Sequence, residues 1–512
     1  STGSLLWVGY IFFGRILCRS PQAGPSAACV CGSLLKVCQC VVGGSEESQV
    51  DVSRCASASE PNLKDEAVFV GCSTSEPQNV CRCCVVRSTP SRAAAYAVAT
   101  LLHGIDGAQL RTEHFMRLSE IHITGFKSIV DQTISLGRVN CFIGANGVGK
   151  SNVLEALGVL GAAATGRVDD EAILRRGVRA GLPRLFKTSF ASGKIPPHIF
   201  LEASGVAVRP DAGAAYRVSL LNPLKKPEPA WSFKSEILSE GEVKLVSRAP
   251  KNKGELNLDE TAGLAALKVV EMAPGAPASV LLKALQNYAI YSPNTPALRA
   301  MVPDPQTRPP VGLVGGGLAQ GFETLKRAVD EEQLDSVLEL IDWVADVSAT
   351  DATHALLSPS VPRAKQSLRF TDRFMASPRN TLTAYDASEG ALYVLFEAVL
   401  CLSPSSPSIF AIDNLDSALN PRLVTRLVSR LAGWLQYADP DRQLLFTAHN
   451  PAVLDGLTLD DDDVRLFAVE RNSEGHTTVR RIALSSELKE QNRTFPLSRL
   501  WAMGNLGAVP NV

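Results

Sequence analysis

The chain has 512 residues, of which 45% are hydrophobic and 20% are charged. This composition excludes a chain that is disordered throughout, and no apolar run approaches the roughly 20 residues of a membrane-spanning helix. The formal net charge is −1, which excludes a protein that coats nucleic acid through its overall charge but leaves room for a local basic patch.

Cysteine is distributed unevenly along the chain. Ten of the 12 cysteines lie in the first 84 residues, and only Cys141 and Cys401 follow residue 115. The early C-x-C pairs are a weak metal signal, because zinc sites favour C-x-x-C, and a disulfide framework needs an oxidising compartment. Since the first methionine is Met116, we interpret residues 1–115 as a poorly ordered, non-native upstream extension and Met116 as the natural start.

After Met116 the pattern predicts a strand, a glycine loop and a helix. Leu118 to Thr124 alternates apolar and polar residues, and Val139 to Ile143 is a short apolar run that ends at a glycine. Ser151 to Leu160 carries apolar residues at helical spacing. The segment between the second strand and the helix therefore joins the end of a buried strand to the start of a helix.

That segment fits the phosphate-loop pattern G-x-x-x-x-G-K-[ST]. Small residues let backbone N–H groups surround phosphates, and the following helix points its positive end at the same anion. A glycine turn that matches by chance is the alternative, but the strand–loop–helix context favours the functional interpretation. The candidate nucleotide-binding residues are Gly144, Ala145, Asn146, Gly147, Val148, Gly149, Lys150, Ser151 and Asn152. We expect Lys150 to contact the β- and γ-phosphates and Ser151 to hold Mg²⁺.

The middle of the chain has no motif that indicates chemistry. Residues 195–260 suggest a β-rich insertion, and Thr261 to Met272 and Ala278 to Tyr288 predict helices. Pro293 to Pro310 reads as a connecting loop, and Phe322 to Val344 as an amphipathic helix.

The last part of the chain supplies a second half for the site. Ser388, Glu389 and Gly390 open an apolar helix, Ala391 to Leu402. A serine and a glycine at a helix N-terminus favour an anion site, although an ordinary N-cap serine is the alternative.

Two buried strands follow, each with a polar side chain after its end. Ile409 to Ile412 precedes Asp413, a candidate ligand of hydrated Mg²⁺. Leu444 to Thr447 precedes His449, a candidate γ-phosphate sensor. Apolar runs bounded by turn signals are typical of parallel strands.

The order of these motifs resembles the ATP-binding-cassette (ABC) ATPases, and within them the group that includes SMC, RecF and OLD proteins. The opening MRLSEIHITGFKSI is similar to that group's first strand and nucleotide-proximal loop, DNLDSALNP to its acid strand and D-loop, and TAHNP to its histidine switch. The resemblance covers about residues 116–205 and 288–457. It implies an α/β fold, a P-loop NTPase head of the ABC type, with a largely parallel central sheet flanked by helices.

The resemblance also implies a mechanism in which two heads enclose two ATP molecules. Ser388 and Gly390 of one subunit would contact the γ-phosphate bound by Lys150 of the other, so ATP and Mg²⁺ would join a homodimer. Only 63 residues follow His449, too few for the nuclease domain of OLD proteins, and we expect none in this chain.

The sequence departs from the family at the residue after Asp413. The family has glutamate there as the base that activates water, whereas this chain has Asn414, and an amide cannot accept that proton. Asp416 or His449 is expected to compensate, or hydrolysis is slow. A Q-loop glutamine is not identifiable around residues 175–177.

These observations give four expected segments. They are a poorly ordered extension (1–115), an ATPase lobe with the phosphate loop (116–205), a β-rich and helical insertion (206–287), and an ATPase lobe with the remaining motifs (288–512).

The first functional hypothesis is a cytoplasmic ATPase head acting in DNA metabolism or phage defence beside a separate effector protein. The second is a non-hydrolytic, ATP-gated scaffold, and the third and weakest is direct DNA repair in the manner of RecF. Arg175, Arg176, Arg179 and Lys187 form a loose cluster that would serve DNA binding or simple solvation.

Overall fold

The computed structural model divides the chain into two compact units, Ser1–Gln109 and Leu110–Val512. For the first unit the structure describes the backbone of its strands. For the second it describes residues 116–507 apart from 192–195, 208–212, 249–258, 274, 353–356, 359 and 362–364.

The described strands of the first unit form a seven-stranded antiparallel sheet with the order β5-β4-β3-β2-β1-β6-β7. These strands are β1 (Leu5–Phe12), β2 (Arg15–Arg19), β3 (Ala28–Gly32), β4 (Val37–Cys40), β5 (Ser48–Asp51), β6 (Phe69–Thr74) and β7 (Cys81–Val86). The expectation of a poorly ordered extension concerns the whole of residues 1–115, most of which lies outside the described residues.

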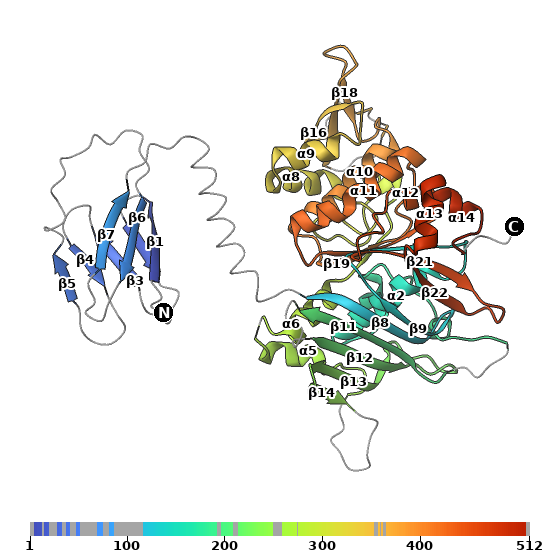
Figure 1. Ribbon diagram of the computed structural model, residues 1–512. Coiled ribbons are helices and arrows are strands. Elements are labelled where there is room, and N and C mark those ends of the chain that lie inside the picture. The colour runs from blue at the N-terminus through green and yellow to red at the C-terminus, as the bar shows by residue number, and fades with distance from the viewer. Residues whose placement is uncertain are drawn as a thin grey trace. The chain divides into compact units, whose positions relative to one another are not determined.

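A six-stranded sheet with the order β15-β19-β20-β10-β21-β22 forms the centre of the second unit (Figure 1). Its strands are β10 (Val139–Ile143), β15 (Ile290–Tyr291), β19 (Ile409–Ile412), β20 (Gln443–Ala448), β21 (Val464–Arg471) and β22 (Thr477–Ile482). All neighbours are parallel except β21 and β22. The predicted strands at 139–143 and 409–412 are confirmed, and the one at 444–447 lies within β20.

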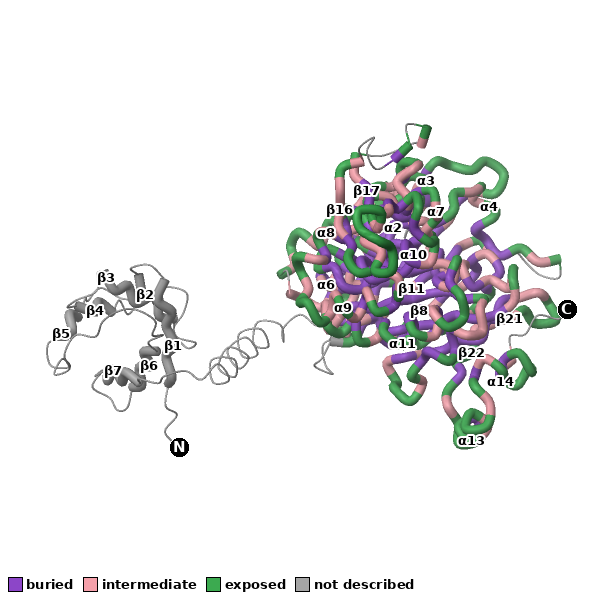
Figure 2. Tube along the Cα trace, turned by 90° about the horizontal axis from the view of Figure 1, so that it is seen from above, coloured by how far each residue is buried: buried purple, intermediate pink, exposed green. Residues whose placement is uncertain are grey.

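The strands β10, β19 and β20 are buried on both faces, and their side chains alternate between two apolar cores. In β10, Cys141 and Ile143 belong to one core and Phe142 to the other. In β20, Phe446 faces the first core and Leu445 the second. This alternation follows from the two-residue period of a strand, and it explains why these strands read as continuous apolar runs. Buried positions accordingly follow the strands through the interior of the unit (Figure 2).

The second core is closed by a six-stranded antiparallel sheet with the order β14-β13-β12-β11-β8-β9. Its strands are β8 (Met116–Phe126), β9 (Ile129–Ser135), β11 (Ile199–Ala207), β12 (Ala214–Leu221), β13 (Ser232–Glu240) and β14 (Val243–Arg248). Because β11 pairs with β8, the β-rich segment extends the sheet that the first strand begins. The expected boundary between residues 205 and 206 falls inside β11.

Helices pack on both sides of the central sheet. Those against the second core include α2 and α6, while α8, α10 and α11 contribute to the first core. The helices are α2 (Lys150–Ala164), α3 (Asp170–Leu174), α4 (Pro183–Phe186), α5 (Ala265–Lys268), α6 (Pro277–Asn287), α7 (Thr295–Leu298), α8 (Leu318–Ala328), α9 (Glu331–Leu338), α10 (Glu389–Leu402), α11 (Pro421–Ala438), α12 (Ala452–Asp455), α13 (Ser486–Thr494) and α14 (Leu497–Ala502). A three-stranded sheet of β16 (Val344–Asp351), β17 (Gln366–Asp372) and β18 (Thr381–Thr383) completes the unit. The predicted α/β fold, with a largely parallel sheet flanked by helices, is confirmed.

Two predicted helices differ from the observed elements. The expected helix from Phe322 to Val344 is two helices and the start of a strand, because the Asp330 side chain accepts the N–H of Gln333 and begins α9 as a new N-cap. The expected helix from Thr261 to Met272 is shorter, comprising α5 and a 3₁₀ turn at Val269–Glu271.

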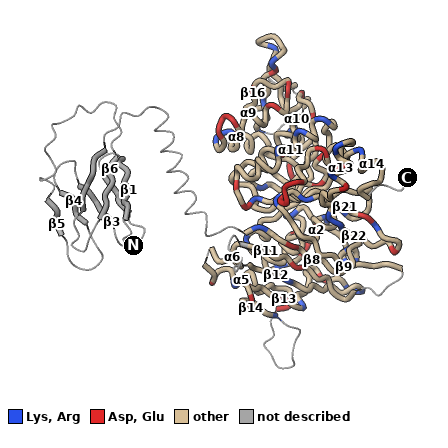
Figure 3. The backbone as a smooth tube through the Cα atoms, viewed as in Figure 1, with Lys and Arg blue, Asp and Glu red and all other residues tan. Residues whose placement is uncertain are grey.

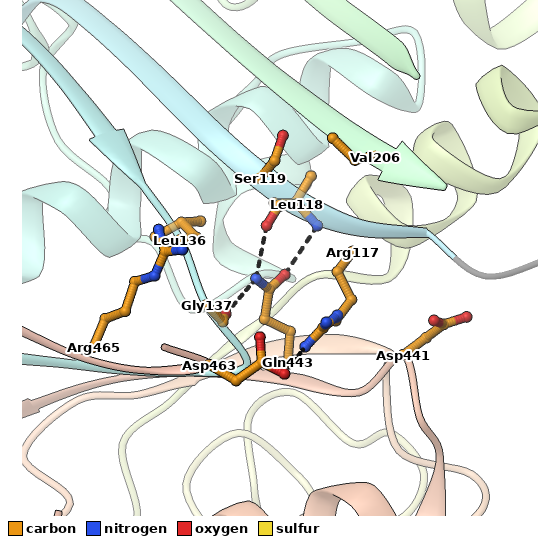
Figure 4. Close-up of a pocket in the computed structure, with 10 residues that line it drawn as sticks. All are labelled: Arg117, Leu118, Ser119, Leu136, Gly137, Val206, Asp441, Gln443, Asp463 and Arg465. Atoms are coloured by element: carbon orange, nitrogen blue, oxygen red, sulfur yellow. Dashed lines mark hydrogen bonds and ion pairs between the residues drawn. The ribbon is translucent and has the colours of Figure 1, made fainter. Parts of the chain in front are cut away.

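The Gln443 side chain joins the two large sheets at the amino ends of the parallel strands (Figure 4). Its Oε1 accepts the N–H of Leu118 at 3.1 Å. Its Nε2 donates to the carbonyls of Leu118 at 2.8 Å and Gly137 at 2.6 Å. A cavity of about 280 Å³ opens beside it, lined in part by Asp441. The phosphate loop lies at the other, carboxyl end of these strands.

Candidate functional site

The phosphate loop connects β10 directly to α2, as the sequence predicts. Its first residue, Gly144, has a positive φ of 154°, and a Cβ there would collide with the carbonyl oxygen of Val469 in β21. Glycine is therefore required where the chain leaves the buried sheet. Asn146 and Gly147, at the tip of the loop, are exposed, so an anion can approach the loop from solvent.

The buried Lys150 side chain turns back onto its own loop. Its Nζ donates to the carbonyl oxygens of Gly144 at 2.8 Å and Ala145 at 3.0 Å, and lies 3.3 Å from Nδ1 of His449. Burial lowers the pKa of Lys150 to about 8, although the carboxylates of Asp413 and Asp416 oppose that shift. The ammonium group thus rests on neutral acceptors, which a charged phosphate can replace with stronger hydrogen bonds.

Asp413 follows β19 and is the centre of an oxygen cluster. The Ser151 hydroxyl lies 3.0 Å from each of its carboxylate oxygens, and the Thr447 hydroxyl donates to Oδ1 at 2.6 Å. The sheet therefore brings the first residues of α2 and the ends of β19 and β20 together. Thr447 has no local signal of this role in the sequence, because it lies within an apolar strand pattern two residues before His449.

The Asp416 side chain is hydrogen-bonded to the backbone of the turn that contains His449. Asp416 Oδ2 accepts the backbone N–H groups of His449 at 3.0 Å and Asn450 at 2.5 Å. Partial burial and the nearby ammonium of Lys150 lower the pKa of His449. Asp416 thereby holds the histidine turn, and its expected role as an alternative proton acceptor stays a prediction.

Asn414 has a left-handed backbone conformation with φ 60°, a region that asparagine tolerates better than most residues. Its N–H donates to the Thr447 hydroxyl at 2.8 Å. The same threonine therefore fixes both Asp413 and the backbone of the next residue.

The expected anion-binding turn at the start of α10 is exposed. The Ser388 hydroxyl accepts the N–H of Ala391 at 3.4 Å, as an N-cap does, and Glu389 is exposed. A Cβ at Gly390 would meet only ordinary contacts, the nearest at 3.5 Å from Leu423 Cδ2. The protomer therefore has room for a Cβ at Gly390, and contact of this turn with a partner's phosphate stays a prediction.

The loose basic cluster at residues 175–187 is not a single surface. Arg176 is buried and donates to the carbonyls of Ala172 and Gln286, each at 2.8 Å. Lys187 is also buried and donates to backbone carbonyls. Lys and Arg are interspersed with Asp and Glu in the view of Figure 3. Two of the four cations are therefore not available to DNA.

The buried carboxylate of Glu155 on α2 pairs with two cations from distant parts of the sequence. Glu155 pairs with Lys127, from the turn between β8 and β9, and its Oε1 accepts Arg179 Nε at 2.6 Å. The bond to Glu155 raises the pKa of Arg179, and the charge of Asp413 adds to this effect. Each cation is visible in the sequence, but no local pattern links either one to Glu155.

The oxygen cluster fits the ion that a P-loop site implies. Mg²⁺ binds hard oxygen ligands and keeps most of its water, so proteins hold it with one or two side chains plus substrate phosphates. Ser151 and Asp413 offer one hydroxyl and one carboxylate at the mouth of the loop, which matches that requirement. Within the described residues no cluster of three or more His, Cys, Asp or Glu side chains suggests a metal site held by protein ligands alone.

Two family models match the chain on the two segments that the sheet brings together. A model described as "AAA ATPase domain" matches residues 116–173, which contain the phosphate loop. A model described as "AAA domain, putative AbiEii toxin, Type IV TA system" matches residues 328–455, which contain Ser388, Asp413 and His449. The DNA replication and repair protein RecF of Paenarthrobacter aurescens (strain TC1) is 29% identical over 147 residues. The two matched segments are similar to AAA-type ATPases, and the chain is similar to an ABC-type ATPase head of the RecF group.

The match to that RecF covers 28% of this chain and 35% of the relative, so the chain spans about a third of the curated relative's length. Solved SMC and RecF structures are also similar to this head. An SMC head bound to the C-terminal winged-helix domain of ScpA has a TM-score of 0.44 at 13% identity, covering 73% of this chain and 99% of that one. The recombination mediator protein RecF has a TM-score of 0.33 at 12% identity, covering 73% and 100%. Among the described helices of this head, none is long and apolar enough to cross a membrane.

Proposed function

We propose that this head binds Mg²⁺–ATP in the Gly144–Ser151 loop and hydrolyses it slowly. The observation that carries the proposal is the convergence of Ser151 and Thr447 on Asp413, beside a loop whose Lys150 rests on its own carbonyl oxygens. These groups come from three strand ends that parallel pairing brings to one edge of the sheet.

Each residue has a distinct part in the proposed reaction. The loop N–H groups and the positive end of α2 receive the triphosphate, and Lys150 exchanges the carbonyls of Gly144 and Ala145 for phosphate oxygens. Ser151 and Asp413 hold Mg²⁺, which supplies charge neutralisation to the phosphates. His449, fixed by Asp416, faces the lysine end of the site and orients the attacking water.

ATP is proposed to join two heads. In that arrangement the turn that contains the exposed Ser388 and the half-buried Gly390 completes the site of the partner subunit, and hydrolysis releases the pair. Coupling to DNA repair is supported by the relationship to RecF, and coupling to defence by the AbiEii description, each through a separate effector.

A non-hydrolytic, ATP-gated scaffold is the second candidate. Asn414 favours it, because this position after the magnesium carboxylate holds no group that can accept a proton from water. The site would then bind ATP tightly and serve as a switch through binding alone.

The experiment that tests the proposal measures ATP affinity and phosphate release by the full chain, with Lys150→Ala as the control. We expect micromolar or tighter binding that Lys150→Ala abolishes. Binding without measurable turnover would select the scaffold, and equal binding by wild type and Lys150→Ala would overturn both candidates.

A further inference from the structure

Thr477, the first residue of β22, is 1% exposed and contacts the phosphate loop from the far end of the chain. Its hydroxyl donates to the carbonyl oxygen of Val148 at 2.6 Å and lies 2.6 Å from the hydroxyl of Ser128. Its backbone N–H donates to the Ser128 carbonyl at 2.8 Å. Neither matched family segment includes residue 477.

The direction of each hydrogen bond in this cluster is determined. A carbonyl only accepts, so the Thr477 proton goes to Val148. Ser128 must then donate its own proton to Thr477, and its oxygen accepts Asn152 Nδ2 at 2.7 Å. The result is one chain of donors from Asn152 in α2, through Ser128 and Thr477, to the loop carbonyl of Val148.

The end of this chain sets the orientation of a single peptide group. In a trans peptide the C=O of one residue and the N–H of the next point in opposite directions. Because the Val148 carbonyl is held toward β22, the N–H of Gly149 is directed away from β22. This N–H makes no hydrogen bond to any residue that the structure describes.

The Thr477 and Ser128 hydroxyls also explain why residue 149 is a glycine. A Cβ at Gly149 would collide with Thr477 Oγ1 and would lie 2.8 Å from Ser128 Oγ. The two hydroxyls therefore occupy the space beside the glycine and fix the peptide at the same time.

We propose that Thr477 and Ser128 are positioning residues that hold the Val148–Gly149 peptide so that the Gly149 N–H faces the phosphate of a bound nucleotide. This inference rests on the proposed ATP site and adds the origin of its preorganisation. The peptide is already oriented in the folded protein, so nucleotide binding loses no free energy in reorienting it.

The test measures the affinity of the full chain for ATP and for inorganic tripolyphosphate. Thr477→Val keeps the side-chain shape and removes the hydroxyl, and we expect both affinities to fall about tenfold, which corresponds to one hydrogen bond. Thr477→Ser should restore both to within about twofold of wild type. Ser128→Ala combined with Thr477→Val should lose little more than Thr477→Val alone, because the two hydroxyls act as one unit.

Thr188→Val is the matched control. Thr188 is buried, and its hydroxyl donates to the Ile129 carbonyl at 3.1 Å rather than to a residue of the phosphate loop. Both valine variants should lower the unfolding temperature of the free protein, but only Thr477→Val should weaken the binding of the two anions. If wild type binds ATP and Thr477→Val binds it equally well, or no worse than Thr188→Val does, the inference is wrong. If wild type binds neither anion, the proposed site fails and the inference fails with it.

Discussion

Nδ1 of His449 lies 3.3 Å from the ammonium nitrogen of Lys150, although 299 residues separate them in the sequence. The lysine ammonium therefore contacts the imidazole ring of His449 as well as the carbonyl oxygens of Gly144 and Ala145. Burial lowers the pKa of both groups, and the charge of the lysine lowers that of His449 further. A triphosphate reverses the balance, because it brings several negative charges to both groups.

The first prediction is that ATP binding takes up protons above the pKa of Lys150. Its pKa is about 8 in the free protein, and bound phosphate must raise it, so the fraction that is neutral becomes protonated on binding. ATP affinity should fall as pH rises above about 8. Calorimetric titration near pH 8.5, in two buffers with different ionisation heats, measures the uptake. Lys150→Arg keeps a permanent charge and should show none; proton release by wild type would contradict the prediction.

The second prediction concerns Asn414. A missing general base costs on the order of 10²–10⁴ in rate, so Asn414→Glu should raise turnover with little change in ATP affinity. The left-handed backbone at φ 60° adds a strain of roughly 1 kcal/mol for glutamate. Asn414→Asp introduces a carboxylate without that strain, since aspartate tolerates this region. Steady-state phosphate release and ATP affinity are the measurements. If wild type is already fast and Asn414→Glu slows it, Asp416 or His449 carries the proton.

The third prediction is that Gly390→Asp blocks ATP-dependent dimerisation without unfolding the protomer. The protomer has space for a Cβ at this position, whereas a carboxylate would face the partner's γ-phosphate and repel it. Gly433→Asp, on α11 where a Cβ meets nothing within 4 Å, is the matched control. Sedimentation with a non-hydrolysable ATP analogue distinguishes the two variants, and a Gly390→Asp protein that dimerises like wild type would exclude the two-head arrangement.

The fourth prediction concerns Asp441, which lines the cavity beside Gln443 (Figure 4). Burial raises the pKa of its carboxyl to about 7. The folded state binds the proton of such an acid more tightly than the unfolded state does. The resulting contribution to stability is fully present below the unfolded pKa of about 4 and is lost as pH rises through about 7. Asp441→Asn should therefore raise the unfolding temperature at pH 8 and change it little at pH 4.

Thermal unfolding at both pH values tests this expectation, with Asp335→Asn, an exposed position on α9, as the control. An unfolding temperature that Asp441→Asn lowers at pH 8 would mean that the ionised carboxylate stabilises the fold.

Local sequence patterns identified the elements whose function or burial is determined by residues that are close together in the sequence. The phosphate loop needs its glycines, lysine and serine at fixed spacing, so Gly144 to Ser151 can be read directly. The strands β10, β19 and β20 are buried on both faces, and their apolar runs predicted their bounds to within one residue, whereas β15, β21 and β22 of the same sheet were not predicted. Less regular segments were harder, and Asp330 shows why: one N-cap divides an amphipathic stretch that would otherwise continue as a single helix.

Only the tertiary structure decided which distant side chains meet at the loop. Thr447 looks like any residue of a buried strand until parallel pairing places it 2.6 Å from Asp413. Thr477 lies far along the chain, and an antiparallel last strand brings it to the Val148 carbonyl. Spacing along the chain determines what a continuous loop can bind. The partners that orient the loop come from strand ends, and their positions depend on the order in which the strands pair.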